Sequence, residues 1–273
     1  WVLSASPQDL VKPWDQKGFK FPGGAPYHPG GFMSFVGASA LVNGKTKGLY
    51  FSAKALLSSV YEGALVDFDT ALRIEARWFT KVLMTDTCTN MARTLFLNKS
   101  ALEKGYQRPD GAEKTNLKQV CVIGSGMMGS GIAYASILQG LEVLLIDQNI
   151  KAAEAGKAKI EMLLSESVKR KKLSEEEKIR LLKKVKTDAS LENISSSDLV
   201  IEAVFEDLNL KHNLYKKIEP HLKEGAILAS NTSTLPITKL SEVLADTTRF
   251  LGIHFFSPVD KMNLVEVIRS ERT

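Results

Sequence analysis

The chain has 273 residues with 25% charged and 44% hydrophobic content and a formal net charge of +5, an ordinary globular composition that excludes disorder as its main state. No apolar run approaches the roughly 18 to 20 residues of a membrane-spanning helix, and the two cysteines, Cys88 and Cys121, form no CxxC pair and no cluster with histidine, which argues against a disulfide scaffold and a metal site. We therefore expect no membrane span, no metal, and a reducing compartment, either the cytoplasm or an organelle matrix.

The segment that opens the chain is predicted to be irregular and wrapped. Five of the nine prolines and five of the nineteen glycines fall in residues 7–31, a composition that disfavours both helix and sheet. The chain begins with WVLSASPQ, which has neither an initiator Met nor a charged-then-apolar leader. We expect a piece of a longer polypeptide, with any targeting signal outside it.

Three helices and a linker are predicted next. From about Ser52 the apolar spacing is helical over SAKALLSSVYEGAL, then over FDTALRIEARWFTKVLM after the capping candidate Asp67, and then over TNMARTLFLNKSALEKG,. Their large apolar side chains are expected to be core contacts without chemistry: Leu72, Trp78, Phe79, Leu83, Leu95 and Phe96. The polar stretch 105–116 is typical of a domain linker, which predicts a first region over 1–116 and a second over 117–273.

Short apolar strands alternate with helices throughout the second region. The predicted strands are Gln119–Ile123, Glu142–Asp147, Leu199–Val204, Ile227–Asn231 and Phe250–Phe256. This alternation predicts an α/β fold with a Rossmann-type, doubly wound, mostly parallel sheet over 117–273, preceded by the irregular segment and the small helical region.

The excess positive charge lies in one helical arm of this region. Residues 151–186 contain 12 Lys and Arg against 6 Asp and Glu and predict two amphipathic helices that meet near Leu173,. No aromatic residues interleave these charges, so we expect no nucleic-acid partner. Two interpretations stay open: a solvated helical face, or a cluster from Lys169 to Lys172 that attracts a phosphate-rich small ligand.

A glycine-rich turn follows the first predicted strand. It reads GSGMMG between the strand KQVCVI and the apolar helix IAYASILQ, and such a turn directs the free N–H groups of a helix N-terminus at a pyrophosphate. Gly124 permits the tight turn, Gly126 lets the backbone approach the phosphate, and Gly129 lets the helix pack on the strand. Met127 and Met128 complete the turn.

A carboxylate follows the next strand and indicates which dinucleotide binds. Asp147 lies 18 residues after Gly129, where a carboxylate accepts both ribose hydroxyls of NAD and repels the 2′-phosphate of NADP. A glycine turn without a ligand would leave Asp147 unexplained. We predict NAD as the cofactor.

A histidine and a glutamate near the end of the chain suggest proton transfer. His254 lies at the predicted carboxyl end of a strand, the edge where ligands bind in open α/β sheets. A returning strand over LVEVI would bring Glu266 beside the imidazole and stabilise its protonated form. This pair suits alcohol oxidation, in which hydride passes to a nicotinamide while His254 takes the hydroxyl proton.

A cluster of hydroxyls and an amide follows the strand ILAS. The residues Ser230 to Thr234 could bind a substrate oxygen or the nicotinamide amide, but they are equally suited to capping the helix that follows. The sequence leaves both interpretations open.

Five motifs together resemble the NAD-binding domain of the 3-hydroxyacyl-CoA dehydrogenases over about residues 117–273. They are VCVIGSGMMGSGIA, LLID, DLVIEAVFEDLNLK, ASNTSTLPI and FLGIHFFSPVDKMNLVEVI. More loosely, KPWDQKGFKFPGG and the helices after it resemble the region that joins the enoyl-CoA hydratase and dehydrogenase halves of multifunctional fatty-acid oxidation proteins. The resemblance implies NAD-dependent oxidation of (3S)-3-hydroxyacyl-CoA in β-oxidation. It also implies a parent protein that is an enoyl-CoA hydratase as well and associates with a thiolase subunit.

The same resemblance assigns roles to individual residues. His254 and Glu266 match the family's catalytic pair, and Ser233 matches the serine that holds the substrate oxygen and the nicotinamide. Glu206 and Lys211 match positions that contact the cofactor.

Other features of the family bear on coenzyme A and on activity. Ser257 stands where the single-function enzymes usually have Asn, and the arm that carries Lys169 and Lys172 matches one that borders the coenzyme A phosphates. The family continues into a helical C-terminal domain that supplies a further active-site Asn, so the resemblance implies a fragment that is poorly active alone. The alternative function is a non-catalytic dinucleotide-binding module. A methyltransferase would show GxGxG and give the His254 pair no role.

Overall fold

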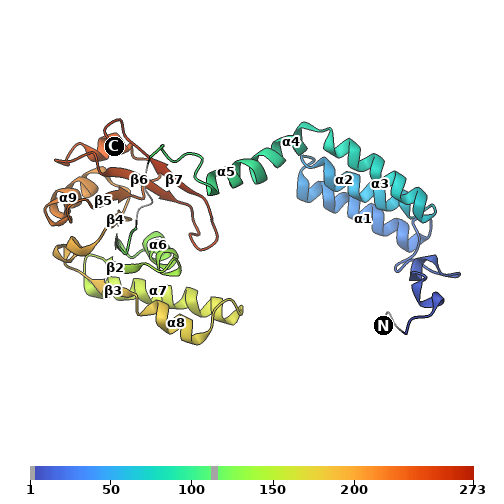
Figure 1. The fold of residues 1–273 in the computed structure, drawn as a ribbon, viewed down its shortest axis with the longest axis horizontal. Coiled ribbons are helices and arrows are strands. Elements are labelled where there is room, and N and C mark those ends of the chain that lie inside the picture. The colour runs from blue at the N-terminus through green and yellow to red at the C-terminus, as the bar shows by residue number, and fades with distance from the viewer. Residues whose placement is uncertain (1–3, 112–115) are drawn as a thin grey trace. The chain divides into compact units, whose positions relative to one another are not determined.

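The chain divides into two compact units. The structure, a computed structural model, describes residues 4–111 and 116–273, and its contacts separate Trp1–Ala112 from Glu113–Thr273 (Figure 1). Residues 112–115, which belong to the predicted linker, lie outside the described residues.

The N-terminal unit is built from helices. Its elements are η1 (Pro7–Leu10), η2 (Pro13–Asp15), α1 (Pro29–Thr46), α2 (Phe51–Gly63), α3 (Phe68–Leu83), α4 (Asp86–Ala92), the π-helical turn η3 (Arg93–Asn98) and α5 (Lys99–Glu103). The predicted cap of α3 is confirmed, because an Asp67 carboxylate oxygen accepts from the Thr70 N–H at 2.9 Å. Helix α1 was not predicted, because its glycines disguise the helical spacing. Packing on α2 supplies what local propensity lacks, and Phe35 meets Tyr61 edge to face at 5.1 Å,.

The prediction that the large apolar side chains of this unit form core contacts is wrong for most of them. Five are between 47% and 70% exposed: Leu72, Phe79, Leu83, Leu95 and Phe96. Trp78 is half-buried and donates to Glu62 at 3.0 Å. These helices form a single layer, in which each helix buries only the side that packs on its neighbours. The apolar side chains on its remaining surface stay exposed to solvent.

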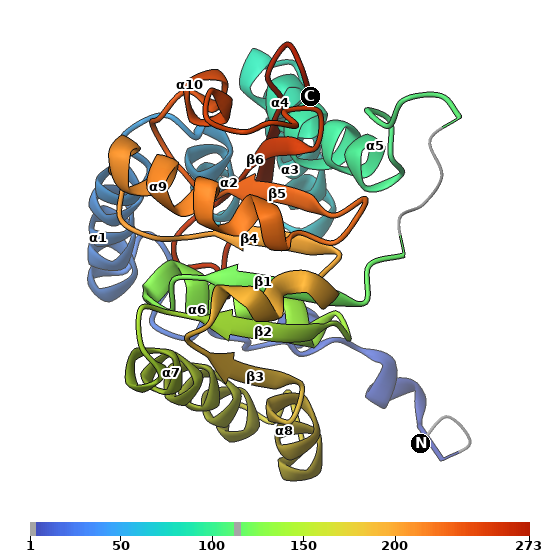
Figure 2. The same cartoon turned by 90° about the vertical axis from the view of Figure 1, so that its left-hand side faces the viewer.

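The C-terminal unit contains one sheet of seven strands. In chain order they are β1 (Gln119–Ile123), β2 (Glu142–Ile146), β3 (Val185–Asp188), β4 (Leu199–Glu202), β5 (Ile227–Ser230), β6 (Phe250–Phe255) and β7 (Val265–Ile268). Figure 2 shows the first six stacked in the order β3-β2-β1-β4-β5-β6. Strand β7 pairs with the outer side of β6. All neighbours are parallel except β6 and β7. The predicted Rossmann-type fold is confirmed, and its strand order reverses between β1 and β4, where such folds bind ligands.

Helices cover both faces of this sheet. They are α6 (Met127–Leu138), α7 (Ile150–Lys169), α8 (Glu175–Leu182), η4 (Leu191–Ser196), α9 (Leu208–Ile218), η5 (Glu219–His221) and α10 (Ile237–Ser241). Side chains of β1 alternate between two cores: Val120 and Val122 pack with α6 to α8, and Cys121 and Ile123 pack with α9 and α10,. No helix in the described ranges is long and apolar enough to cross a membrane.

Strand β3 corrects the predicted extent of the helical arm. The arm was predicted over 151–186, but β3 begins at Val185 and pairs in parallel with β2. Val185 is its one fully buried residue, so the local pattern of this edge strand is too polar to indicate a strand. The predicted junction of the two arm helices agrees with the structure, since Ser174 caps α8 in a capping box with Glu177,.

Candidate active site at the carboxyl edge of the sheet

The glycine turn after β1 is held by backbone contacts that no side chain could share. Gly124 has φ +100°, and a Cβ on it would lie 2.5 Å from the Ala203 carbonyl oxygen. A Cβ on Gly129 would lie 1.7 Å from the Gly124 carbonyl oxygen. Both glycines are therefore required by the fold itself.

Gly126 differs from these two glycines, because no contact within the protein requires a glycine at this position. A Cβ there would meet nothing within 4 Å, and the residue lies immediately before the first turn of α6. Open space over a backbone that leads into a helix N-terminus fits the pyrophosphate of a dinucleotide. Met127 borders this space and is 69% exposed, whereas Met128 is half-buried.

Asp147 is hydrogen-bonded to the same turn. Its Oδ2 accepts from the Ser125 N–H at 2.7 Å and from the Ser125 hydroxyl at 2.6 Å. Partial burial by itself raises the pKa of Asp147, but the bonds from Ser125 outweigh it and lower the pKa below its usual value,. The carboxylate is therefore ionised at neutral pH. It half faces solvent at the end of β2, where a ribose would lie.

His254 and Glu266 face each other across β6 and β7. The antiparallel register pairs the two residues directly, and the imidazole Nδ1 lies 2.8 Å from Glu266 Oε2. An ionised carboxylate only accepts, so Nδ1 carries the proton and the lone pair of Nε2 faces the opposite way. Nε2 lies 3.2 Å from the Ser233 hydroxyl oxygen. The structure thus brings the three predicted catalytic residues together.

The loop after β5 does not cap the helix that follows it, which was one of the two roles that the sequence left open. The Thr232 hydroxyl accepts from the Leu235 N–H at 3.0 Å, but Leu235 precedes α10, whose N-cap residue Pro236 makes no side-chain capping bond. Asn231 accepts from the Phe255 N–H at 2.9 Å and ties the loop to β6. Ser233 is left to meet His254.

Glu206 and Lys211 lie behind this loop. Glu206 Oε1 accepts from the backbone N–H of Ser233 at 3.0 Å. Lys211 is 1% exposed and contacts Glu206 and a carboxylate that the sequence analysis missed, Glu202. The overlooked signal was a glutamate inside the apolar strand sequence LVIEAV.

Three predicted substrate contacts form no hydrogen bond with the catalytic trio. Ser257 is exposed, with its hydroxyl 3.9 Å from the Met127 sulfur. Lys169 and Lys172 are exposed at the tip of the hairpin that α7 and α8 form beyond the sheet (Figure 1). The structure does not bring these lysines to the Ser233 loop.

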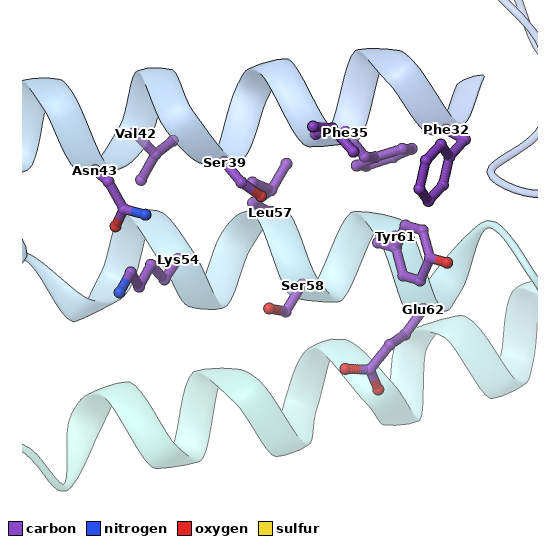
Figure 3. A pocket seen from close by; sticks show the side chains of 11 residues that line it. Phe32, Phe35, Ser39, Val42, Asn43, Lys54, Leu57, Ser58, Tyr61 and Glu62 are labelled. Carbon is purple, nitrogen blue, oxygen red and sulfur yellow. The ribbon is translucent and has the colours of Figure 1, made fainter. Parts of the chain in front are cut away.

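The N-terminal unit has a hollow of its own. It measures about 420 Å³ and lies between α1 and α2, with Phe35 and Tyr61 toward one end and Asn43 and Lys54 toward the other (Figure 3). None of the predicted site residues lines it. Among residues 4–111 and 116–273, no group of three or more His, Cys, Asp or Glu side chains could hold a metal ion.

Comparison with known proteins identifies similar chains. Residues 119–273 match the model of the family described as "3-hydroxyacyl-CoA dehydrogenase, NAD binding domain". The fatty acid oxidation complex subunit alpha of Psychrobacter sp. (strain PRwf-1) is 34% identical over 243 residues, which are 88% of this chain and 33% of the relative. The chain therefore spans about a third of the length of the curated relatives it matches.

Solved structures agree with the sequence match. The (S)-3-hydroxybutyryl-CoA dehydrogenase of Ralstonia eutropha is 39% identical with a TM-score of 0.57, over 58% of this chain and 56% of that one. The dehydrogenase part of multifunctional enzyme 1 from C. elegans is 31% identical with a TM-score of 0.53, over 60% of this chain and 37% of that one.

Proposed function

The chain belongs to the 3-hydroxyacyl-CoA dehydrogenase family, and on this premise we propose that it serves the NAD-dependent oxidation of (3S)-3-hydroxyacyl-CoA to 3-oxoacyl-CoA. The observation that carries the proposal is the contact series from Ser233 through His254 to Glu266, at 3.2 and 2.8 Å. It lies on the same edge of the sheet as the family's dinucleotide turn.

The proposed chemistry divides between the cofactor and the side chains. Bound NAD supplies the acceptor for the hydride that leaves carbon 3 of the substrate. His254 Nε2 takes the proton of the 3-hydroxyl, and the Glu266 carboxylate stabilises the imidazolium that forms. The Ser233 hydroxyl donates to the substrate oxygen and holds it beside Nε2.

Turnover separates this proposal from its alternative, a dinucleotide-binding module without catalysis. We expect the chain to oxidise NADH when a 3-oxoacyl-CoA such as acetoacetyl-CoA is added, followed in single turnover with enzyme in excess. Ser233→Ala should slow this reaction, and the matched control is Ser165→Ala, which alters a half-buried serine of α7 whose hydroxyl donates to the Glu161 carbonyl oxygen. NADH binding without any turnover would favour the binding module.

The cofactor preference rests on Asp147. We expect NAD to bind more tightly than NADP, because the 2′-phosphate would face an ionised carboxylate. Asp147→Ala should weaken NAD about 10 to 100-fold, the range for hydrogen bonds to a charged group, and should narrow the gap to NADP. Calorimetric titration measures both, with Asp188→Ala at the end of β3 as control. Equal or tighter NADP binding by the unchanged chain would contradict the assignment.

The basic tip of the α7–α8 hairpin is proposed to attract the coenzyme A phosphates. Arg170 is paired with Glu166 at 3.1 Å, while Lys169, Lys171 and Lys172 are exposed and have no carboxylate partner among the described residues. Exposed pairs with phosphate are screened over about 8 to 10 Å at physiological salt. Coenzyme A affinity should therefore fall as salt rises.

Neutralising the four residues 169–172 should remove most of this salt dependence. Neutralising four exposed lysines of the other unit removes the same charge and serves as control: Lys12, Lys17, Lys20 and Lys45. If coenzyme A affinity depends on salt as strongly in the first variant as in the unchanged chain, the basic tip is a solvated surface without a role in binding.

The wider setting is also proposed. The relatives' name, fatty acid oxidation complex subunit alpha, supports a parent protein that is a subunit of a fatty acid oxidation complex. Hydration of enoyl-CoA by this parent and its association with a thiolase subunit are what the family resemblance implies. The free Cys88 and Cys121 support a reducing compartment such as the cytoplasm or an organelle matrix.

A further inference from the structure

A fully buried carboxylate lies beneath the catalytic edge of the sheet. Glu202 ends β4 and is 0% exposed. Its two oxygens accept from the Val204 N–H, the Tyr215 hydroxyl and the Ser230 hydroxyl at 2.7 to 2.8 Å. A buried charge is retained only where such bonds and a counter-ion compensate for lost water, so this position calls for an explanation beyond packing.

The counter-ion is Lys211, from the first turn of α9. Its Nζ lies 2.8 and 3.0 Å from the two oxygens of Glu202 and 3.1 Å from Glu206 Oε2. An ammonium group has three donors, and these three contacts match them. With 1% exposure, Lys211 has no donor left to offer a ligand.

Glu206 passes this constraint to the catalytic loop. Oε2 faces Lys211, while Oε1 accepts from the Thr232 hydroxyl and from the backbone N–H groups of Ser233 and Thr234 at 3.0 and 3.2 Å. A second path starts at Glu202, since the Ser230 hydroxyl that donates to it accepts from the Thr232 N–H at 3.2 Å. Both paths end at the residues that flank the Ser233 side chain.

We propose that Glu202, Lys211 and Glu206 act as one positioning relay for the loop that carries Ser233, an inference that rests on the proposed function. The buried Glu202 fixes the ammonium group, which fixes Glu206, and Glu206 in turn fixes the backbone of Ser233. The relay sets the hydroxyl of Ser233 beside His254 Nε2. Lys211 is thereby a positioning residue, whereas the family resemblance implied a cofactor contact.

The charge of Lys211 also governs the protonation of Glu206. Partial burial by itself raises the pKa of Glu206, but the bond from Thr232 and the charge of Lys211 outweigh it and bring the pKa to about 2. Because this pKa is depressed, the acceptor role of Glu206 persists at all pH values well above 2 and is lost only in strong acid. Removing the lysine charge should move that loss toward neutral pH.

Among the residues that the structure describes, every charged group that faces Glu206 belongs to the relay or its immediate neighbours. From β4 comes Glu202, and from α9 come Lys211 and Tyr215. Burial and then the charge of Glu202 raise the pKa of Tyr215, so its phenol stays a donor. From the loop come hydroxyls alone, with His254 beyond Ser233.

The test compares three substitutions, Glu202→Gln, Lys211→Met and Glu206→Gln, with Lys217→Met on the exposed side of α9 as the matched control. We expect hydrogen exchange at the Ser233 and Thr234 amides to accelerate about tenfold or more in all three, and turnover to fall about tenfold or more. NADH affinity in Glu202→Gln and Lys211→Met, and the KM for 3-oxoacyl-CoA in all three variants, should change about threefold at most. The control should match the unchanged chain.

The pH dependence distinguishes positioning from a general loss of structure. In Lys211→Met, protection of the two amides should fall as pH decreases from 7 toward 5, as Glu206 takes up a proton. Adding Glu206→Gln to this variant should reduce that acid sensitivity. If Lys211→Met does not fold, Glu206→Gln provides the same exchange measurement, because that side chain is 38% exposed and tolerates replacement better.

Two outcomes would overturn the relay. One is unchanged exchange at Ser233 and Thr234 in all folded variants, and the other is NADH affinity that falls tenfold in Lys211→Met with exchange unchanged, which would identify a direct cofactor contact. If the unchanged chain has no dehydrogenase activity but the variants show the expected exchange, the proposed function fails and the relay stands as a determinant of loop order.

Discussion

His254→Gln is expected to reduce oxidation of 3-hydroxyacyl-CoA by roughly 10² to 10⁴-fold, the typical loss on removing a general base. NAD affinity should stay nearly unchanged, because the imidazole lies on β6 and the glycine turn follows β1. Glutamine keeps the size of the side chain but cannot take the proton. The chemical step is measured in single turnover, in this chain and in a chimera continued with the C-terminal part of a curated relative.

Two further substitutions define the defect. His221→Gln makes the same chemical change on η5, away from the catalytic edge, and should retain full activity. Glu266→Gln keeps a group that can hold the ring but no longer offsets its positive charge, so it should lower the rate with little effect on KM. If His254→Gln kept full activity while Ser233→Ala abolished it, the proton would leave by another route.

Two alanine substitutions three positions apart in the glycine turn should have different effects: Gly129→Ala should lower stability, and Gly126→Ala should lower NADH affinity. Gly129→Ala forces a Cβ against the Gly124 carbonyl oxygen, at 1.7 Å in the present geometry. Backbone must move, and overpacking of this kind costs about 1 to 3 kcal/mol or more. We expect a melting temperature lower by about 2 to 12 °C, at roughly 2 to 4 °C per kcal/mol, or a unit that does not fold.

Gly126→Ala should leave the melting temperature unchanged, because its Cβ would meet no protein atom within 4 Å. The new methyl group would occupy the space proposed for the pyrophosphate, so NADH affinity should fall about tenfold or more, equivalent to 1.4 kcal/mol. Gly37→Ala, also without a neighbour within 4 Å, controls for the substitution itself. Normal NADH binding by Gly126→Ala would show that the phosphate does not lie against this turn.

The sequence predicted those parts of the fold whose signal is local. The buried runs of β1, β2 and β5 are apolar enough to identify as strands, and the strand–turn–helix order around Gly124 identified the dinucleotide turn. Edge strand β3 and helix α1 were missed, because long-range pairing and packing stabilise them. Phe79 and Phe96 were predicted to be core residues but are exposed, for a related reason. The helical spacing of apolar residues does not show which of them will find a packing partner.

The site was predictable to the same extent. His254 lies near the carboxyl end of β6 and Ser233 follows β5, and parallel strands gather their carboxyl ends at one edge. Glu266 reaches the same edge because the antiparallel strand β7 begins there. The buried Glu202 was missed because its partner, Lys211, lies nine residues on, on a helix, and only the packing of that helix over the sheet joins the two charges.

The antiparallel pairing of β6 and β7 has a consequence for how the chain folds. His254 and Glu266 are separated by 12 residues, so the hairpin that joins them closes a short loop. The parallel partners Val120 and Leu199 are 79 residues apart. Loop closure is less costly and contact formation faster at small sequence separation, so the imidazole–carboxylate pair can assemble within its own hairpin. The contact of the glycine turn with β4 must wait for the long crossover, which places the acid–base machinery among the first parts of the sheet to acquire its native partners.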